Sequence, residues 1–240
     1  MKDTMQVKLI SYTQLNPGAF RGDVDPYADT PNTAQELVAF CARVSNPSNQ
    51  FNKETSERLI QYLIRHQHWS PFEMVSACLE IETTRDIARQ ILRHRSFSFQ
   101  EFSQRYADPL NELHLIPREA RLQDTSNRQN SVQLNFANPE HRELARWWLD
   151  AQRDIIRQVQ DTYRQAISLG IAKEVARAIL PEGNTMSRMY MNGTLRSWIH
   201  YIDLRSANGT QLEHQEIARA CAEVIAKIFP MMTNNGQLAS

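Results

Sequence analysis

Residues 93–106, RHRSFSFQEFSQRY, hold the densest group of side chains that could do chemistry. Three arginines, one histidine, three serines and one glutamate fall within fourteen positions. Guanidinium groups bind phosphate through paired, permanently charged donors, while hydroxyl and carboxylate groups can bind the polar edge of a pyrimidine. The segment therefore predicts a site for phosphate or a pyrimidine.

Directly before this segment, arginines recur every four residues at Arg85, Arg89 and Arg93. On a helix this spacing stacks the three side chains on one face, where like charges are mildly destabilising unless an anionic group compensates them. Asp86, which lies beside the row, is one candidate for that group. The alternative is a basic face that is simply solvated.

The 93–106 segment resembles the signature of the flavin-dependent thymidylate synthases (the ThyX family), which reads Arg-His-Arg, two residues, Ser, four residues, Ser, one residue, Arg. All six fixed positions are present, as Arg93, His94, Arg95, Ser98, Ser103 and Arg105. Four further blocks are similar to the family and occur in its order: CARVS at 41–45, HWSPFE at 68–73, GIAKEVARAILP at 170–181 and TLRSWIHYIDLR at 194–205. The resemblance therefore extends over most of the chain.

The resemblance implies two neighbouring ligand sites. The expected deoxyuridylate (dUMP) site comprises Gln90, Arg93, Glu101, Phe102, Ser103, Gln104, Arg105, Arg177 and Arg205. The expected FAD contacts are His68, Ser70, Arg93, His94, Arg95, Glu101, Thr194, Leu195, Arg196 and His200. NADPH is the implied reductant, 5,10-methylenetetrahydrofolate is the implied carbon donor, and the implied assembly is a homotetramer with active sites where subunits meet. No metal is expected.

The implied chemistry differs from that of thymidylate synthases that attack the uracil with a cysteine. No cysteine here has a histidine or basic neighbour in sequence, and the family dispenses with that nucleophile. Arg205 is expected to stabilise the negative charge that develops on the uracil ring as its N3 proton is lost, a role for a group that does not titrate. Ser98 and Ser103 have no evident base and are expected to be hydrogen-bond partners. Gly209 stands where many members have a flavin-contacting histidine, so FAD contacts there should differ.

The elements that must position these residues follow from apolar periodicity and caps. Thr33 and Glu36 form a capping box, and Asn138, Pro139 and Gly170 frame a helix of about 30 residues. Expected helices run from Thr33 to Val44, and over 54–66, 84–94, 139–169, 172–181, 195–204 and from the Asn208-Gly209 turn to Pro230. Expected strands cover 5–12, 75–81 and 186–191, with a loop from 13 to about Pro31 and a polar, mobile surface excursion over 121–137.

Each helix has an apolar stripe that predicts its buried face. The expected inward residues are Leu37, Phe40, Cys41 and Val44; Leu59, Tyr62 and Leu63; Trp148, Ala151, Ile155, Val159, Thr162 and Ala166, with Trp147 and Tyr163 beside them; and Ile217, Ala220, Cys221, Val224 and Ile228. The aromatic residues of the long helix are expected to form core or oligomer contacts. Helices outnumber strands, so the expected fold is α+β: one helix-rich domain over 1–240, with a small mixed or antiparallel sheet and a long central helix, as in the resembled family.

Composition limits the other possibilities. The 240-residue chain has no net formal charge, so nothing global draws it to nucleic acid or an acidic membrane. Cys41, Cys78 and Cys221 are far apart and are expected to be buried apolar residues in a reducing, cytoplasmic compartment. No apolar run is long enough to span a membrane. His66 and His68 lack zinc-type partners, His114, His141 and His214 are expected to be surface or packing residues, and the absence of a Gly-x-Gly pair argues against a Rossmann fold.

Two alternatives remain open. A helical nucleic-acid-binding protein could place Arg93, Arg95 and Arg105 on phosphates and stack Phe97, Phe99, Phe102 or Tyr106 on bases, and it would show steep salt dependence. A relative of the family that has lost catalysis could serve as an oligomeric scaffold. Retention of Arg177, Arg205 and the full signature argues against the scaffold.

Overall fold

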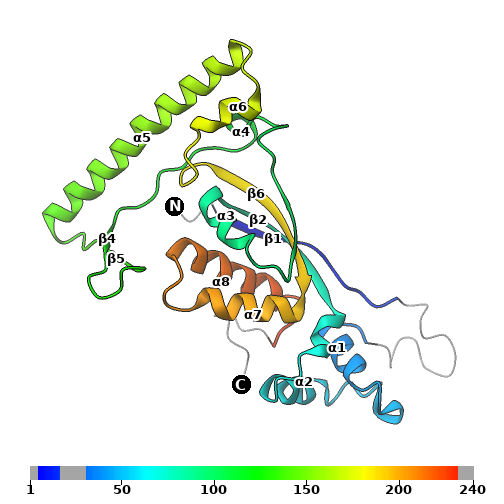
Figure 1. Cartoon of the computed structure of the whole chain (residues 1–240). Coiled ribbons are helices and arrows are strands. Elements are labelled where there is room, and N and C mark those ends of the chain that lie inside the picture. Colours follow the sequence, from blue (N-terminus) through cyan, green and yellow to red (C-terminus); the bar gives the residue numbers. More distant parts are fainter. Residues whose placement is uncertain (1–4, 17–30, 232–240) are drawn as a thin grey trace.

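The computed structural model describes residues 5–16 and 31–231, so most of the loop expected before Pro31, and the Met1–Thr4 start, lie outside the described residues. A four-stranded sheet in the order β1-β2-β6-β3 is at the centre of the molecule, and every neighbouring pair is antiparallel (Figure 1). Its strands are β1 Gln6–Tyr12, β2 Ser76–Thr84, β6 Met186–Thr194 and β3 Ser98–Glu101. The helix-rich α+β architecture with a small antiparallel sheet is therefore confirmed.

The described helices connect and cover this sheet. They are α1 Ala34–Ala42, α2 Ser56–Arg65, α3 Arg85–Ile91, α4 Pro109–Glu112, α5 Pro139–Ser168, α6 Lys173–Ala176, α7 Leu195–Ser206 and α8 Leu212–Ala226, with 3-10 turns η1 Pro47–Asn49, η2 Ser70–Met74 and η3 Arg177–Ile179. Alternate residues of β2, Ala77, Leu79 and Ile81, are fully buried, as period-two burial of one face requires. They share one core cluster with the apolar residues of α7 and α8, which lie side by side against the sheet (Figure 1).

The arginine row does not exist as a stack on one helix. The expected helix to His94 ends at Ile91, so Arg93 lies beyond it. Arg85 pairs with Glu101 at 3.4 Å, and the Arg89 Nε donates to Glu182 at 2.6 Å. Asp86, the expected partner, accepts from Arg118 at 2.8 Å instead. Distant carboxylates therefore neutralise Arg85 and Arg89, which local spacing could not reveal.

Three expected helix faces are rotated in the structure. In α1 the buried residues include Val38 and Ala39, while Val44 is exposed. In α2 Leu63 is buried as expected, but Ile60 is also buried and Tyr62 is exposed. In α5 the buried residues are Gln152, Ile156 and Tyr163, whereas Trp147, Trp148 and Ile155 are exposed. Because these helices have apolar residues on more than one face, periodicity alone did not determine which face meets the core. The expected face of α8 is largely correct, since Ile217, Cys221, Val224 and Ile228 are buried.

The caps of the long helix α5 match the prediction. Asn138 Oδ1 accepts from the Glu140 N–H at 2.9 Å, Pro139 is the first helical residue, and Gly170 follows the end with a positive φ of 85°. The helix extends away from the sheet (Figure 1) and packs mainly through a second small cluster of Tyr163, Ala176 and Leu180. The preceding excursion contains a two-stranded hairpin, β4 Arg121–Gln123 and β5 Ser131–Gln133, that the polar sequence did not predict.

The cysteines only partly match the expectation. Cys221 is fully buried, but Cys41 and Cys78 are half-buried, and none of the three forms a disulfide. Among residues 5–16 and 31–231, no helix is long and apolar enough to cross a membrane. The same described residues contain no group of three or more His, Cys, Asp or Glu side chains placed to hold a metal ion.

Candidate functional site

The 93–106 segment bends back on itself between α7 and β6. Its first arm runs antiparallel to α7: His94 lies against Arg205 near the end of that helix, and the Ser96 carbonyl accepts from Ser197 Oγ at 3.3 Å near its start. Its second arm is β3, where Ser98 pairs with Asn192 of β6. The signature segment is therefore held against α7 by its first arm and against β6 by its second arm.

Phe97 anchors the bend. Its ring is buried and packs against Trp198 and Tyr201, with centroid distances of 4.8 and 5.9 Å. The other side of the ring lies directly over Gly193, where a Cβ atom would be 2.4 Å from the ring. Close approach of strand and ring thus requires glycine at this position.

Arg205 and His94 form the centre of the candidate site. The Arg205 Nε donates to His94 Nε2 at 2.9 Å. Burial, together with the positive charge of Arg205, lowers the pKa of His94, which keeps the imidazole neutral and able to accept. Among the described residues, the two terminal nitrogens of Arg205 make no hydrogen bond. The guanidinium is therefore oriented through one edge while its other edge is left for a ligand.

Gln90 joins this centre through His214, which sequence analysis assigned only to the surface or to packing. His214 is fully buried on α8, and its two ring nitrogens lie 3.2 Å from Gln90 Oε1 and 3.1 Å from the Tyr201 hydroxyl. The Tyr201 ring is in turn 4.9 Å from the His94 ring, edge to face. The only signal in sequence was a histidine at a buried position of an amphipathic helix, which is more often a packing residue.

The end of the signature reaches the short helix α6. Arg105 pairs with Glu174 at 3.4 Å, and the Lys173 ammonium donates to the Tyr106 carbonyl at 3.1 Å. Arg177 follows directly after α6 and is half-buried. Four of the expected dUMP residues therefore form two pairs in one chain: Gln90 and Arg205, which contact His214 and His94, and Arg105 and Arg177, which lie at α6.

Glu101 and Gln104 lie within the second arm and its extension. The Glu101 carboxylate accepts from Ser187 Oγ at 2.8 Å as well as from Arg85, and the Phe102 N–H donates to the Arg188 carbonyl. Gln104 is buried, and within the described part of the chain its Nε2 has no partner. A buried donor without a partner is uncommon and is typical of a site completed by another molecule.

Most of the expected FAD contacts lie between η2 and the first half of α7. The His200 ring is 4.7 Å from Trp69, Arg196 pairs with Glu73, and Thr194 Oγ1 caps α7 by accepting from the Ser197 N–H. His68 and Ser70 are exposed at the start of η2, and Arg93 and Arg95 are exposed on the signature. Leu195 differs from this group, because its side chain is completely buried in the core and has no surface for a ligand.

Two surface cavities lie away from the residues predicted to bind dUMP and FAD. One surface cavity of about 790 Å³ lies beside α8 and is lined by Arg118, Arg121 and Glu213 among others. Another, of about 460 Å³, lies at the turn between α1 and α2. Neither of these two cavities is lined by a residue predicted to bind dUMP or FAD.

Comparison with known proteins adds independent information. Residues 28–231 match the protein family described as "Thymidylate synthase complementing protein". The chain is 48% identical over 226 residues to a probable flavin-dependent thymidylate synthase of Paramecium bursaria Chlorella virus 1, covering 94% of this chain and 96% of that one. It is also 48% identical over 200 residues to a flavin-dependent thymidylate synthase of Synechocystis, covering 83% and 88%.

The fold has solved counterparts. A crystal structure of the UMP/dUMP methylase PolB from Streptomyces cacaoi bound with 5-Br UMP superposes with a TM-score of 0.69 over 97% of this chain and 92% of that chain. Sequence identity to it is 24%, so this likeness concerns the fold alone.

Proposed function

The chain belongs to the family of flavin-dependent thymidylate synthases, and we propose that it methylates dUMP to thymidylate with a bound flavin and without a thiol nucleophile. The observation that carries this proposal is the hydrogen bond of 2.9 Å between Arg205 and His94. It joins the last of the family-like blocks to the signature, two segments about a hundred residues apart in the chain. The arginine proposed to activate the base thus lies against the segment proposed to recognise the nucleotide.

The thiols are unsuited to nucleophilic attack on the uracil. Burial raises the pKa of Cys41, of Cys78 and, most strongly, of Cys221. A thiolate is the reactive form, and nucleophilic cysteines have a lowered pKa. Activation of the base must therefore come from another group.

Arg205 can supply this activation electrostatically. A guanidinium remains charged at any physiological pH, and His94 holds it in one orientation before the substrate arrives. Its unpaired edge would stabilise negative charge on the uracil ring as the N3 proton is lost. Because the donors are oriented beforehand, little reorganisation is needed when the charge develops.

The other arginines suit the phosphate of dUMP. Arg177 has no ion-pair partner among the described residues, and Arg105 has only an exposed carboxylate partner, Glu174. Forked guanidinium donors bind phosphate bidentately, so these side chains would hold the anion while Gln90 and Arg205 meet the base. Gln104 would use its unpaired Nε2 toward the same ligand.

The donor set between η2 and α7 fits a flavin dinucleotide. Arg93 and Arg95 are exposed and have no ion-pair partner within the described chain, which suits a diphosphate. His200 offers an imidazole beside the Trp69 ring, and His68 offers an exposed one before η2. Thr194, Arg196, Ser70 and Glu101 would add polar contacts, whereas Leu195 could contribute only main-chain atoms. When bound, the flavin supplies the hydride, with NADPH as its reductant and methylenetetrahydrofolate as the carbon donor.

We further propose that the working form is a homotetramer in the cytoplasm. In one chain the predicted dUMP residues are spread over separate elements, and α5 exposes Trp147 and Ile155 to solvent. Apolar residues exposed on one element mark interaction surfaces. A second subunit would cover these side chains and complete the site, and three unpaired thiols suit a reducing compartment.

Thymidylate formation from dUMP, methylenetetrahydrofolate and NADPH by the flavin-loaded protein tests the function directly. Arg205→Ala is expected to fold and to keep its flavin spectrum while kcat falls by about 10²–10³, the cost of removing one transition-state donor. Arg219→Ala, on the neighbouring helix, is the matched control and should keep full activity. If Arg205→Ala retained near-normal turnover, the assigned activating group would be wrong; if wild type made no thymidylate, the function itself would be wrong.

A further inference from the structure

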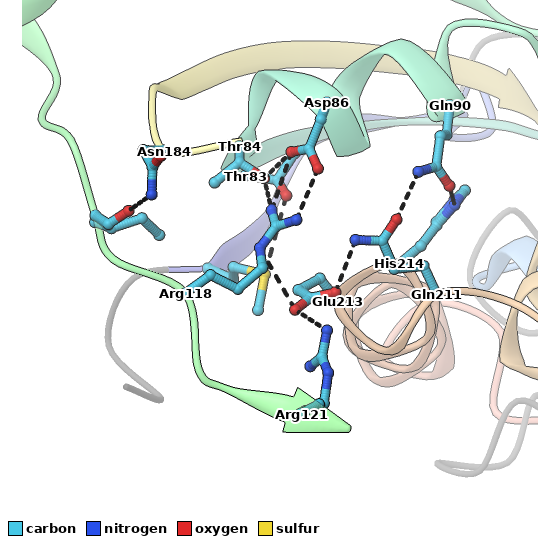
Figure 2. A network of polar contacts seen from close by, with 12 residues as sticks. Thr83, Thr84, Asp86, Gln90, Arg118, Arg121, Asn184, Gln211, Glu213 and His214 are labelled. Atoms are coloured by element: carbon cyan, nitrogen blue, oxygen red, sulfur yellow. Dashed lines mark hydrogen bonds and ion pairs between the residues drawn. The ribbon is translucent and has the colours of Figure 1, made fainter. Parts of the chain in front are cut away.

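A continuous series of hydrogen-bonded, buried or half-buried polar groups runs from the candidate site to Arg121, the first residue of β4, and to Arg118, which precedes β4. Figure 2 shows the part from His214 to these arginines. Tyr201, His214, Gln90, Gln211 and Glu213 are linked in that order by hydrogen bonds of 3.1, 3.2, 2.9 and 3.1 Å. Glu213 then pairs with Arg121 at 2.6 Å and with Arg118 at 3.6 Å. The chain therefore ends at a carboxylate held between two guanidinium groups.

That carboxylate determines the direction of every hydrogen bond in the chain. An ionised carboxylate only accepts, so Gln211 must direct its Nε2 to Glu213 and its Oε1 to Gln90. Gln90 must then direct its Nε2 to Gln211 and its Oε1 to His214. His214 must donate from Nδ1 and accept from the Tyr201 hydroxyl at Nε2. The network of hydrogen bonds therefore allows only one orientation of each glutamine amide and one tautomer of His214.

Burial makes this arrangement hard to reverse. His214 is fully buried, so water cannot replace a lost partner of its ring. If the Gln90 amide turned over, its N–H would face the Nδ1–H of His214 and its oxygen would face the Gln211 oxygen. Burial, the charge of Arg205 and the neighbouring His94 imidazole lower the pKa of His214 to about 3, so His214 is neutral, as a ring with one donor and one acceptor requires.

We propose that His214 and Gln211 are positioning residues that hold the Gln90 amide in one orientation, so that its free N–H meets the 4-oxo group of uracil and rejects the 4-amino group of cytosine. In this orientation Gln90 retains one N–H that no described residue uses. This inference rests on the proposed function, because it assigns Gln90 to the base of the nucleotide.

The selectivity follows from donor and acceptor chemistry. A carbonyl oxygen accepts the amide N–H, and the bond strengthens when the ring gains negative charge. An amino group at the same position is itself a donor, so cytosine would leave two donors facing each other. A glutamine free to turn would offer its oxygen to the amino group and lose this discrimination. Sites built around one fixed hydrogen bond reject the mismatched analogue far better than shape alone does.

The test measures the dissociation constants of dUMP and dCMP by titration calorimetry with the flavin-loaded protein. The variants Gln211→Leu and His214→Phe each release one side of the Gln90 amide. The expected result is a fall of about tenfold in the ratio of the dCMP to the dUMP constant, the value of about one hydrogen bond, with flavin content unchanged. His214→Asn can still donate to Gln90 and should restore the ratio to within about twofold.

Gln215→Leu is the matched control. This glutamine of α8 is buried, but it bonds to the Thr210 carbonyl and to Arg219, outside the series of hydrogen bonds from Tyr201 to Glu213. If Gln211→Leu and His214→Phe folded but kept the wild-type ratio of the dCMP to the dUMP dissociation constant, the inference would be overturned. If His214→Phe lost its fold or flavin, Gln211→Leu, at a half-buried position, would decide the question alone. If the wild-type protein bound no dUMP, the proposed function would be wrong. If the wild type were active but the variants kept its ratio of dissociation constants, only the positioning role of His214 and Gln211 would be wrong.

Discussion

Arg177 shows how a single charge can be assigned to one of two ligands. It is half-buried after α6 and, within the described chain, has no carboxylate partner, whereas the nearby Arg105 has Glu174. Arg177→Ala is expected to raise the KM for dUMP about 10- to 100-fold, the value of a charged hydrogen bond, and to leave flavin affinity within about twofold. Steady-state kinetics and flavin titration measure the two effects.

Arg164→Ala is the matched control for Arg177. Arg164 forms an exposed pair with Asp161 on α5, three residues apart, and such pairs contribute little. Both constants should stay at the wild-type value in this variant. Equal weakening of dUMP and flavin by Arg177→Ala would contradict its assignment to the phosphate.

His214 gives the protein a predictable dependence of stability on pH. Its pKa is about 3 in the folded chain, chiefly because of burial, and about 6.5 when unfolded. Below about pH 6.5 His214 binds a proton in the unfolded chain but not in the folded chain. The contribution of His214 to stability is therefore present above that pH and is lost as the pH falls toward 3. The expected loss approaches about 1.4 kcal/mol per pH unit in this window.

Urea unfolding at pH 7 and pH 4.5 checks this expectation. The lowered pKa of His94 acts in the same direction, so part of the pH dependence will remain in any His214 variant. His214→Asn removes the titrating ring and should show a clearly smaller loss of unfolding free energy between the two pH values. An identical loss in wild type and variant would mean that His214 does not titrate as the structure implies.

At the scale of elements, the close packing of β6 on the signature depends on Gly193. A methyl group there would overlap the Phe97 ring, and moving the ring would disturb the bend between the two arms of the segment. Gly193→Ala is expected to lower the free energy of unfolding by about 1–3 kcal/mol, as overpacking of a core does. Thermal unfolding with flavin-free protein measures this change.

Gly183 provides the matched substitution for Gly193. It lies in the turn before β6, and a Cβ atom there would meet nothing within 4 Å. Gly183→Ala should therefore change stability by less than about 0.5 kcal/mol. Comparable losses in both variants would point to backbone conformation, and not to the Phe97 contact, as the reason for glycine at position 193.

At the scale of the whole molecule, the exposed apolar side of α5 bears on assembly. Trp147 is 63% exposed and Ile155 is 52% exposed, and the helix extends away from the sheet (Figure 1). If this side packs against other subunits, Trp147→Glu should dissociate the proposed tetramer and abolish thymidylate formation together. Sedimentation velocity and activity assays at the same protein concentration measure both.

Arg157→Glu tests whether any charge change on α5 has the same effect. Arg157 is highly exposed and pairs only with Asp154 one turn away. This variant should remain tetrameric and active. Unchanged assembly in Trp147→Glu would exclude this side of α5 as an interface and would leave the sharing of sites between subunits without support.

The sequence by itself determined the family and the fold class. These depend on local order, because the signature, the caps of α5 and the alternation in β2 are readable from neighbouring residues. Exposed and buried faces were less predictable in α1, α2 and α5, where apolar residues occur around more than one side and only packing selects among them.

Only the tertiary structure decided which distant groups meet. His94 lies against Arg205, Asp86 pairs with Arg118, and His214 is bonded to Gln90. These contacts join residues 32 to 124 positions apart, and no local pattern specifies them. The physical reason is that a buried polar group must find a partner wherever the fold places one, so the pairing is a property of the packed molecule and not of the segment.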